Sequence, residues 1–181
     1  VSAGGFHTCG IMTTGTVKCW GNDAAGQSIP PAGTFQTVST GGVHTCGITT
    51  TGSAECWGRD ENGQSTPPDG TFETVSAGGY HTCGITTTGT VECWGWDTYG
   101  QSTPRGGTFQ NVSAGRFHTC GVRSTGSAAC WGMNTYGQST PPDGTFETVS
   151  AGGYHTCGVT TTGTVECWGR DDDGQSTPPE L

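Results

Sequence analysis

The chain has 181 residues, enough for one compact domain, and its composition excludes several classes of protein. It contains 34 Gly but only 2 Met and a single Leu, which leaves too few long apolar side chains for amphipathic helices, so we expect an all-β fold. A net charge of -9 with only six Lys and Arg residues argues against nucleic-acid binding, because phosphate backbones attract basic surfaces. No apolar run reaches the roughly 18 residues that span a bilayer, so we expect no membrane insertion and a signal peptide already removed.

A repeat of constant length runs through the whole chain. A Val-Ser pair recurs at Val1, Val38, Val75, Val112 and Val149, so the period is 37 residues without insertion. The units are therefore 1–37, 38–74, 75–111, 112–148 and 149–181, and we expect them to form a single repeat domain. Such a period is typical of propellers, solenoids and arrays.

Short alternating stretches separated by Gly, Pro and Asx turns predict three strands in each unit. In the second unit we place these strands at residues 34–40, 44–49 and 53–58, and a short fourth strand near residues 64–66.

The second and third strands of each unit are expected to form a hairpin. In the first unit, a three-residue loop that ends in a left-handed Gly15 places Ile11 opposite Val17 and Cys9 opposite Cys19. Cross-strand cysteines lie close enough for a disulfide, whereas their spacing does not supply the usual four ligands of a zinc site. The register therefore predicts the pairs Cys9/Cys19, Cys46/Cys56, Cys83/Cys93, Cys120/Cys130 and Cys157/Cys167.

Ten cysteines in five local pairs also indicate the compartment. Disulfides persist in oxidising environments, so we expect a secreted or cell-surface, extracellular protein. Each bridge closes a small loop and should contribute about 2 to 3 kcal/mol to stability.

One Trp, one His and one Asp or Asn also recur in every unit. Alternation places the Trp on the hairpin face opposite the cystine, so we expect an indole packed over a glycine between neighbouring blades. We expect a ring nitrogen of each His to be held by backbone, and the Asp or Asn after Trp-Gly to cap a turn. We predict no metal site and no cofactor; the run that begins at Asp171 resembles the start of a calcium loop, but it lacks the distal Glu of such loops.

The segments A-G-G-Y-H-T-C-G and G-T-V-E-C-W-G-x-D-x-x-G-Q resemble the regulator-of-chromosome-condensation repeat, and the resemblance runs through all five units. The compact unit with paired cysteines is most similar to the short-blade extracellular branch, which includes a β-lactamase-inhibitor propeller and crinkly-type receptor ectodomains. The resemblance implies an all-β propeller of five 37-residue blades without catalytic activity, which binds through loops on one rim. Such propellers commonly have seven blades, so an open or incomplete array is the alternative.

The units differ mainly in the turn after Trp-Gly and in the two residues before His. Aromatic and Arg side chains at these positions are candidates for partner binding, because such residues dominate protein interfaces. The predicted partner-binding residues are Phe6, Tyr80, Trp96, Tyr99, Arg116, Phe117, Tyr136 and Tyr154.

Three functions stay open at this point, and none of them is enzymatic, because no nucleophile motif, phosphate-binding loop or paired-carboxylate cleft is present. The first is recognition of a protein partner through the rim. The second is lectin-like binding of a glycan by several similar sites, which would gain avidity from repetition. The third is self-association into an extracellular fibre or coat, which would cover the edges of an open array.

Overall fold

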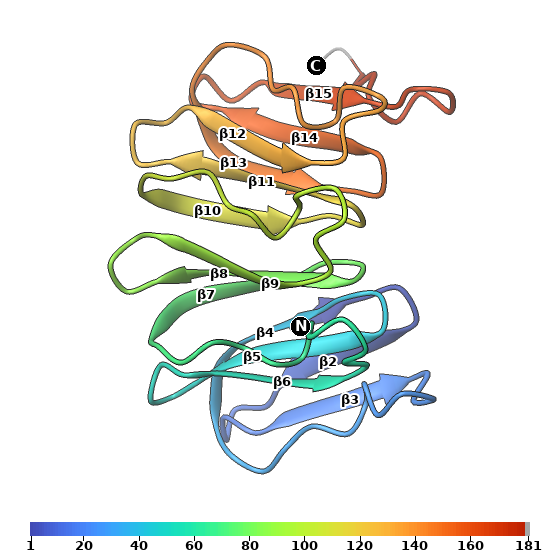
Figure 1. Cartoon of the computed structure of the whole chain (residues 1–181), viewed down its shortest axis with the longest axis vertical. Coiled ribbons are helices and arrows are strands. Elements are labelled where there is room, and N and C mark those ends of the chain that lie inside the picture. Colours follow the sequence, from blue (N-terminus) through green and yellow to red (C-terminus); the bar gives the residue numbers. More distant parts are fainter. Residues whose placement is uncertain (180–181) are drawn as a thin grey trace.

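The computed structural model describes residues 1–179, and each of the five units forms a three-stranded antiparallel sheet (Figure 1). Within each sheet the strands follow the order of the chain. Among the described residues no helix is long and apolar enough to cross a membrane. The strands are β1 (Ser2–Ala3), β2 (His7–Ile11), β3 (Val17–Gly21), β4 (Phe35–Thr40), β5 (His44–Thr49), β6 (Ala54–Gly58), β7 (Phe72–Ala77), β8 (His81–Thr86), β9 (Val91–Gly95), β10 (Phe109–Ala114), β11 (His118–Arg123), β12 (Ala128–Gly132), β13 (Phe146–Ala151), β14 (His155–Thr160) and β15 (Val165–Gly169).

The three strands predicted for the second unit are confirmed to within one residue by β4, β5 and β6. The predicted fourth strand at residues 64–66 is wrong, because this segment forms a turn. The Asp60 carboxylate accepts hydrogen bonds from the Ser65 amide at 2.7 Å and the Thr66 hydroxyl at 2.6 Å. These bonds fold the segment back on itself and prevent an extended conformation.

The hairpin between β2 and β3 has the predicted register, with Ile11 opposite Val17 and Cys9 opposite Cys19. The Met12 amide donates to the Thr16 carbonyl at 2.8 Å and closes the loop. Gly15 has a φ of 83°, in the left-handed region that favours glycine. Local turn geometry therefore determines which residues face each other in each hairpin.

Each sheet contains one disulfide between its second and third strands. The five bonds join Cys9 to Cys19, Cys46 to Cys56, Cys83 to Cys93, Cys120 to Cys130 and Cys157 to Cys167. No free cysteine occurs in residues 1–179.

The five disulfides differ in accessibility, and we expect the more accessible bonds to be reduced before the buried ones. Cys120 and Cys130 are buried, whereas Cys157 and Cys167 are half-buried in the last sheet. Because a thiolate must reach a sulfur atom to break the bond, limited dithiothreitol should open the bond of Cys157 first and that of Cys120 last. Differential alkylation followed by peptide mass spectrometry measures the order, and simultaneous reduction of both bonds would contradict it.

Neighbouring sheets pack face to face and share an apolar core. At the first interface, Cys9 and Val17 of the first sheet contact Phe35 and Trp57 of the second. Equivalent cores lie at the other three interfaces, and each combines a cystine from one sheet with a Phe and a Trp from the next. The apolar core is therefore divided among the interfaces between units.

The prediction that an indole lies over a glycine is wrong in one respect. The ring over Gly47 belongs to Phe35, whose Cδ1 would lie 2.7 Å from a Cβ atom added to this glycine. Trp57 packs against the edge of Phe35, with ring centroids 5.9 Å apart. A register shift between Phe35 and Thr37 accompanies this arrangement, which the alternation pattern alone does not reveal.

A Gly-Gly pair, which is Gly-Arg in the fourth unit, lies shortly before each His, and its backbone joins neighbouring sheets. The Gly42 amide donates to the Gly78 carbonyl of the next sheet at 3.0 Å, and the Gly5 amide donates to the Gly41 carbonyl at 3.1 Å. A Cβ atom on Gly41 would lie 2.3 Å from the Gly78 carbonyl oxygen. Only glycine permits this close approach between backbones, so the first glycine of each pair is needed for packing.

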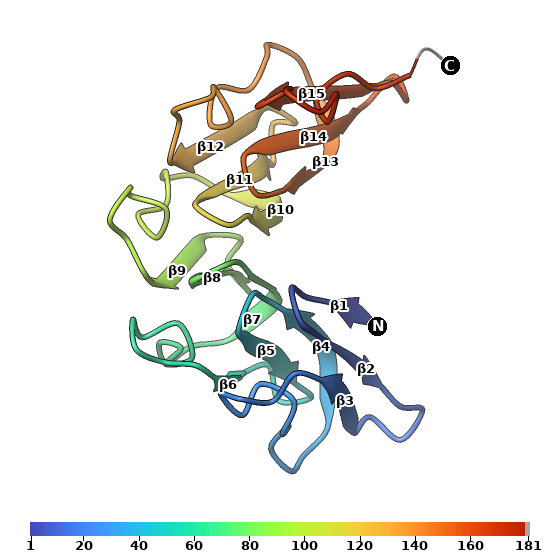
Figure 2. The same ribbon diagram turned by 90° about the vertical axis from the view of Figure 1, so that its right-hand side faces the viewer.

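The five sheets follow one another along an arc, with the first and last sheets at opposite ends (Figures 1 and 2). Two sheet faces at these ends take no part in the inter-sheet cores of residues 1–179. Trp20 on the first sheet is 56% exposed, whereas Trp57, its counterpart in the second sheet, is 8% exposed. Val165 on the last sheet is 40% exposed.

Candidate binding surface

The two segments that vary between units lie side by side on one rim. In each unit the first residue of the turn after Trp-Gly donates its amide hydrogen to the carbonyl of the residue before His. In the third unit this bond joins the Trp96 amide to the Tyr80 carbonyl at 3.0 Å, and in the fourth it joins Met133 to Phe117 at 2.9 Å. The variable positions of each unit therefore belong to one surface.

Six aromatic side chains from the third, fourth and fifth units contact one another on this rim. The ring centroids of Tyr80 and Trp96 are 5.8 Å apart, and those of Trp96 and Phe117 are 5.7 Å apart. The contact between Phe117 and Tyr154, at 5.5 Å, continues the cluster into the fifth unit. We call this cluster the aromatic patch; its members are Tyr80, Trp96, Tyr99, Phe117, Tyr136 and Tyr154.

The structure brings seven of the eight predicted residues together. Arg116 joins the aromatic patch through its guanidinium, which lies 4.9 Å from the centroid of the Phe117 ring. Phe6 is 70% exposed but has no aromatic contact among residues 1–179. Its neighbour in the second unit is Val43, so no row of rings connects it to the patch.

The aromatic patch is partly exposed and contains a recess. Tyr99 and Tyr136 are 46% and 47% exposed, respectively. Asn62, Tyr80, Trp96 and Phe117 line a recess of about 310 Å³. Exposed aromatic clusters of this kind mark interaction sites on soluble proteins, since isolated rings are common but contiguous apolar patches are rare.

The loops that carry the patch are held by their own hydrogen bonds. In the third unit the Asp97 carboxylate accepts from the Ser102 amide at 2.6 Å and from the Thr103 hydroxyl at 2.7 Å. The buried Gln101 side chain accepts from the Tyr99 amide at 2.9 Å. The Asp therefore caps the turn as expected, and the glutamine is a supporting residue that our sequence reasoning missed, although it recurs in every unit.

The charged residues on the flanks of the patch form local pairs. Arg170 donates to Asp172 at 2.6 Å, and its guanidinium lies 5.8 Å from the Tyr136 ring. Arg59 donates to Glu61 on the other flank. The Asp171 carboxylate accepts from Thr177 and from the Ser176 amide, and these hydrogen bonds lower the pKa of Asp171.

The acidic run that resembles the start of a calcium loop thus contributes to a capped turn and an ion pair. Among residues 1–179 no group of three or more His, Cys, Asp or Glu residues is arranged to hold a metal ion.

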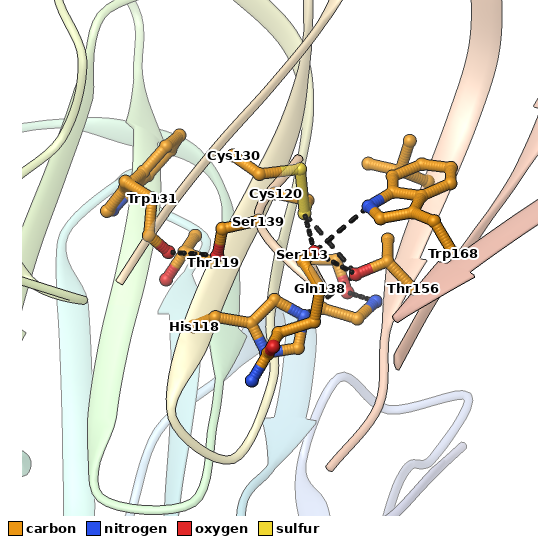
Figure 3. Close-up of a disulfide and its surroundings, with 12 residues drawn as sticks. Ser113, His118, Thr119, Cys120, Cys130, Trp131, Gln138, Ser139, Thr156 and Trp168 are labelled. Carbon is orange, nitrogen blue, oxygen red and sulfur yellow. Dashed lines mark hydrogen bonds between the residues drawn. A yellow bond between two sulfur atoms is a disulfide. The ribbon is translucent and has the colours of Figure 1, made fainter. Parts of the chain in front are cut away.

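Four of the five repeated histidines link neighbouring sheets among residues 1–179. Nε2 of His44 lies 2.8 Å from the Thr82 hydroxyl of the next sheet, and that hydroxyl donates to the Gln64 carbonyl at 3.1 Å. The Trp94 indole donates to the same carbonyl at 3.0 Å. The equivalent network of His118, Thr156, Gln138 and Trp168 is drawn beside a disulfide in Figure 3. The expectation that backbone holds the His nitrogens is therefore wrong, because a threonine hydroxyl is the partner.

This network determines the protonation state of the histidines. Because the Thr hydroxyl donates to a carbonyl, it must accept the Nε2 hydrogen of a neutral imidazole. The Nδ1 atoms of His44, His81 and His118 are buried and have no hydrogen-bond partner among residues 1–179, so a second proton would be unsatisfied there. Burial lowers the pKa of His44 and His118 to about 4 and of His81 to about 3, with a smaller contribution from neighbouring histidines.

Small antiparallel sheets that stack face to face along an arc, and carry loops on one rim, define a propeller-type repeat protein. The model of the regulator of chromosome condensation (RCC1) repeat matches all five units, at residues 1–27, 35–64, 72–101, 109–138 and 146–175. The chain belongs to this family, as the sequence motifs predicted.

Solved structures of similar fold include two plant receptor ectodomains. The ectodomain of the receptor kinase CR4 from Physcomitrella patens is 31% identical, with a TM-score of 0.79 over 93% of this chain and 49% of that chain. The CRINKLY WD40 ectodomain of the Arabidopsis thaliana receptor kinase ACR4 is 30% identical, with a TM-score of 0.75 over 92% of this chain and 63% of that chain.

A more distant structure shares the fold alone. Prp20p from Saccharomyces cerevisiae is 15% identical, with a TM-score of 0.82 over 99% of this chain and 58% of that chain. The chain thus spans less than two thirds of the length of each of these three structures. A comparison with curated proteins found no match.

Proposed function

We propose that this chain is a non-catalytic extracellular module that binds a protein partner through the aromatic patch. The observation that carries the proposal is the meeting of six aromatic side chains from three units on one exposed rim. The capped loops hold these rings in place before binding, so little conformational entropy is lost on association.

The composition of the patch favours a protein ligand. Trp, Tyr and Arg are enriched among the residues that contribute most to protein–protein affinity, and they cluster near the centre of an interface. Trp96 and Tyr99 of the patch, with Arg116 against its Phe117 ring, supply all three residue types. We further propose that the five units act as one domain, since adjacent units share their apolar cores.

Five disulfides and the similarity to receptor-kinase ectodomains point to an extracellular location. The absence of catalysis remains part of the proposal. It is supported by the structural use of the histidines, since the hydrogen bonds of His44, His81 and His118 are made to threonines inside the fold.

Replacing Trp96, Tyr99 and Tyr136 together with alanine should weaken partner binding at least about 100-fold, because central aromatic anchors each contribute on the order of 2 kcal/mol or more. The measurement is the Kd of a partner isolated from the extracellular proteins of the source organism, determined by biolayer interferometry. Phe6→Ala is the matched control, since Phe6 is a more exposed ring outside the patch. Equal affinity of the triple variant and the wild type would reject the patch as the binding surface.

Recognition of a glycan is less well supported by the distribution of the rings. A lectin-like array needs similar sites in every unit, whereas the aromatic patch is confined to the third, fourth and fifth units. A glycan array separates the two functions, because binding that depends on Trp96 would identify a sugar as the ligand.

Assembly through the ends of the arc is a second candidate function, favoured by the exposure of Trp20 and Val165. Inside the arc of residues 1–179, each sheet face of this kind packs against another sheet of the same type. We therefore expect the outer faces of the first and last sheets to bind a similar sheet. Further blades or a second copy of the chain would cover them equally. Light scattering over a concentration series tests self-association, and a constant monomer mass would exclude it.

A further inference from the structure

Arg116 is an unusual residue for its position in the repeat. The equivalent residues of the other units are glycines: Gly5, Gly42, Gly79 and Gly153. The Arg116 amide nevertheless donates to the Gly152 carbonyl at 3.1 Å, as the glycines of the first three units do to the next sheet. Its backbone therefore keeps the common structure, and only the side chain is added to the rim.

The Arg116 side chain is held in place by two neighbours. Its Cγ would lie 3.0 Å from a Cβ atom on Gly79, so the stem of Arg116 packs against this glycine of the preceding unit. Its guanidinium lies over Phe117, at 4.9 Å from the ring centroid. A cation above an aromatic face keeps the edge of the guanidinium, with its N–H donors, free to bind an acceptor.

The other arginines have oxygen acceptors within the described part of the chain, whereas Arg116 has none there. Arg59 donates to Glu61, Arg170 to Asp172, Arg105 to the Cys130 carbonyl and Arg123 to the Gly106 carbonyl. The guanidinium of Arg116 makes no hydrogen bond to another residue in the range 1–179. Judged by the contacts of residues 1–179, it is therefore the one arginine of the rim available to an acceptor from outside.

Arg116 also lies where two recesses meet. It lines a recess of about 420 Å³ at the inner side of the arc, together with Tyr80 and the glycine pairs. Tyr80 also lines the recess of about 310 Å³ formed with Asn62, Trp96 and Phe117. An extended ligand at this junction can contact the cation and the aromatic recess at the same time.

The carboxylates of the rim loops have partners other than Arg116. Asp97 binds Ser102 and Thr103, and Glu61 and Asp172 bind their own arginines. The net charge of -9 will slow the approach of an acidic ligand, but that long-range effect is screened beyond about 8 Å at physiological ionic strength. At contact, the guanidinium offers an acidic ligand N–H donors that carry a positive charge.

We propose that the partner presents an extended acidic peptide segment to this junction, an inference that rests on the proposed function. An Asp or Glu carboxylate of the segment binds the guanidinium of Arg116 through two hydrogen bonds. A large apolar side chain of the segment enters the recess formed by Tyr80, Trp96 and Phe117, beside the amide of Asn62. The combination of one charge and one apolar anchor defines the specificity of the site.

The experiment uses a phage-displayed library of random dodecapeptides, selected on the full chain with its disulfides intact. We expect an Asp or Glu at a constant spacing from an aromatic or large aliphatic residue. Arg116→Gln should weaken the selected peptides about 10-fold or more, and replacing their carboxylate by an amide should weaken wild-type binding equally but leave Arg116→Gln binding unchanged. Arg116→Gly must give the same loss; it restores the residue found in the other units, so the turn remains compatible with the fold.

Two controls separate this inference from the function on which it rests. Lys18→Gln removes the same charge from β3 of the first unit and should change the affinity less than 2-fold, which corresponds to less than about 0.4 kcal/mol of binding free energy. Some selected peptides could need Trp96 yet carry no acidic residue, carry Lys or Arg at that position, or bind Arg116→Gln normally. Such peptides would overturn the inference of an acidic segment and would still support the patch as the binding surface. Peptides that bind Trp96→Ala normally would reject the patch itself, and a selection that enriches no peptide would reject a linear segment.

Discussion

Replacing Trp94 with alanine should lower the free energy of unfolding by about 3 to 5 kcal/mol, the usual cost of removing a buried Trp. Trp94 is 8% exposed, packs against Phe72 at a centroid distance of 5.9 Å, and donates to the Gln64 carbonyl at 3.0 Å. The substitution would create a cavity between two sheets and would leave the carbonyl with one donor fewer. Denaturant unfolding followed by circular dichroism, under oxidising conditions, measures the loss.

Trp20→Ala is the matched control for this prediction, because Trp20 has the same place in the repeat but is 56% exposed. We expect it to cost less than about 1 kcal/mol, as substitutions at exposed positions usually do. Equal losses for the two variants would contradict the difference in burial. They would also indicate that the outer face of the first sheet is covered in solution, which would favour assembly through the ends of the arc.

Lowering the pH from 7 to 5 should destabilise the protein by about 5 kcal/mol through His44, His81 and His118 together. Their pKa values in the folded state are lowered from 6.5 to about 4, 3 and 4, so the unfolded chain takes up protons first. The stabilisation is complete above pH 6.5 and is lost as the pH falls from there toward about 4. Each buried His contributes a slope of about 1.4 kcal/mol per pH unit within this window.

Denaturant midpoints at pH 7, 6 and 5, at constant ionic strength, measure this dependence above the range in which most carboxylates titrate. His81→Gln should remove about one third of the slope, because Gln does not titrate. The readout is the slope of the free energy of unfolding against pH. The absolute free energy is unsuitable, because losing the contact of His81 with Thr119 lowers it at every pH. Equal stability at pH 7 and pH 5 would show that these histidines are accessible to protons in the folded state.

The hairpins were predictable because their geometry is local. A three-residue turn with a left-handed Gly15 determines that Cys9 faces Cys19, and the same spacing in each unit places the other four pairs. Contacts between sheets, and the register shift within the second sheet, do not follow from such patterns. His44 reaches Thr82 across 38 residues of sequence, and Phe35 occupies the space over Gly47 that alternation assigns to Trp57.

The aromatic patch could be predicted from the sequence in part. The variable positions could be read from the repeat, and seven of the eight chosen residues meet on one rim. The separation of Phe6 from the patch could not be read in this way, because it depends on the non-aromatic Val43 beside it in space. The recess beside Asn62 and the packing of Arg116 on Gly79 likewise involve residues from successive units.

The amino-acid sequence by itself determined the five-unit organisation and the all-β class, because periodicity and composition can be read without a fold. It also determined the hairpin register and the cysteine pairs, because these depend on residues a few positions apart. Only the tertiary structure decided which rings touch, which histidine nitrogen is bound and which tryptophan is exposed. These properties depend on how one sheet lies on the next, and that stacking brings together side chains from units that the repeat pattern treats as equivalent. The position of the sheet in the arc thus makes Trp20 a surface residue and Trp94 a core residue.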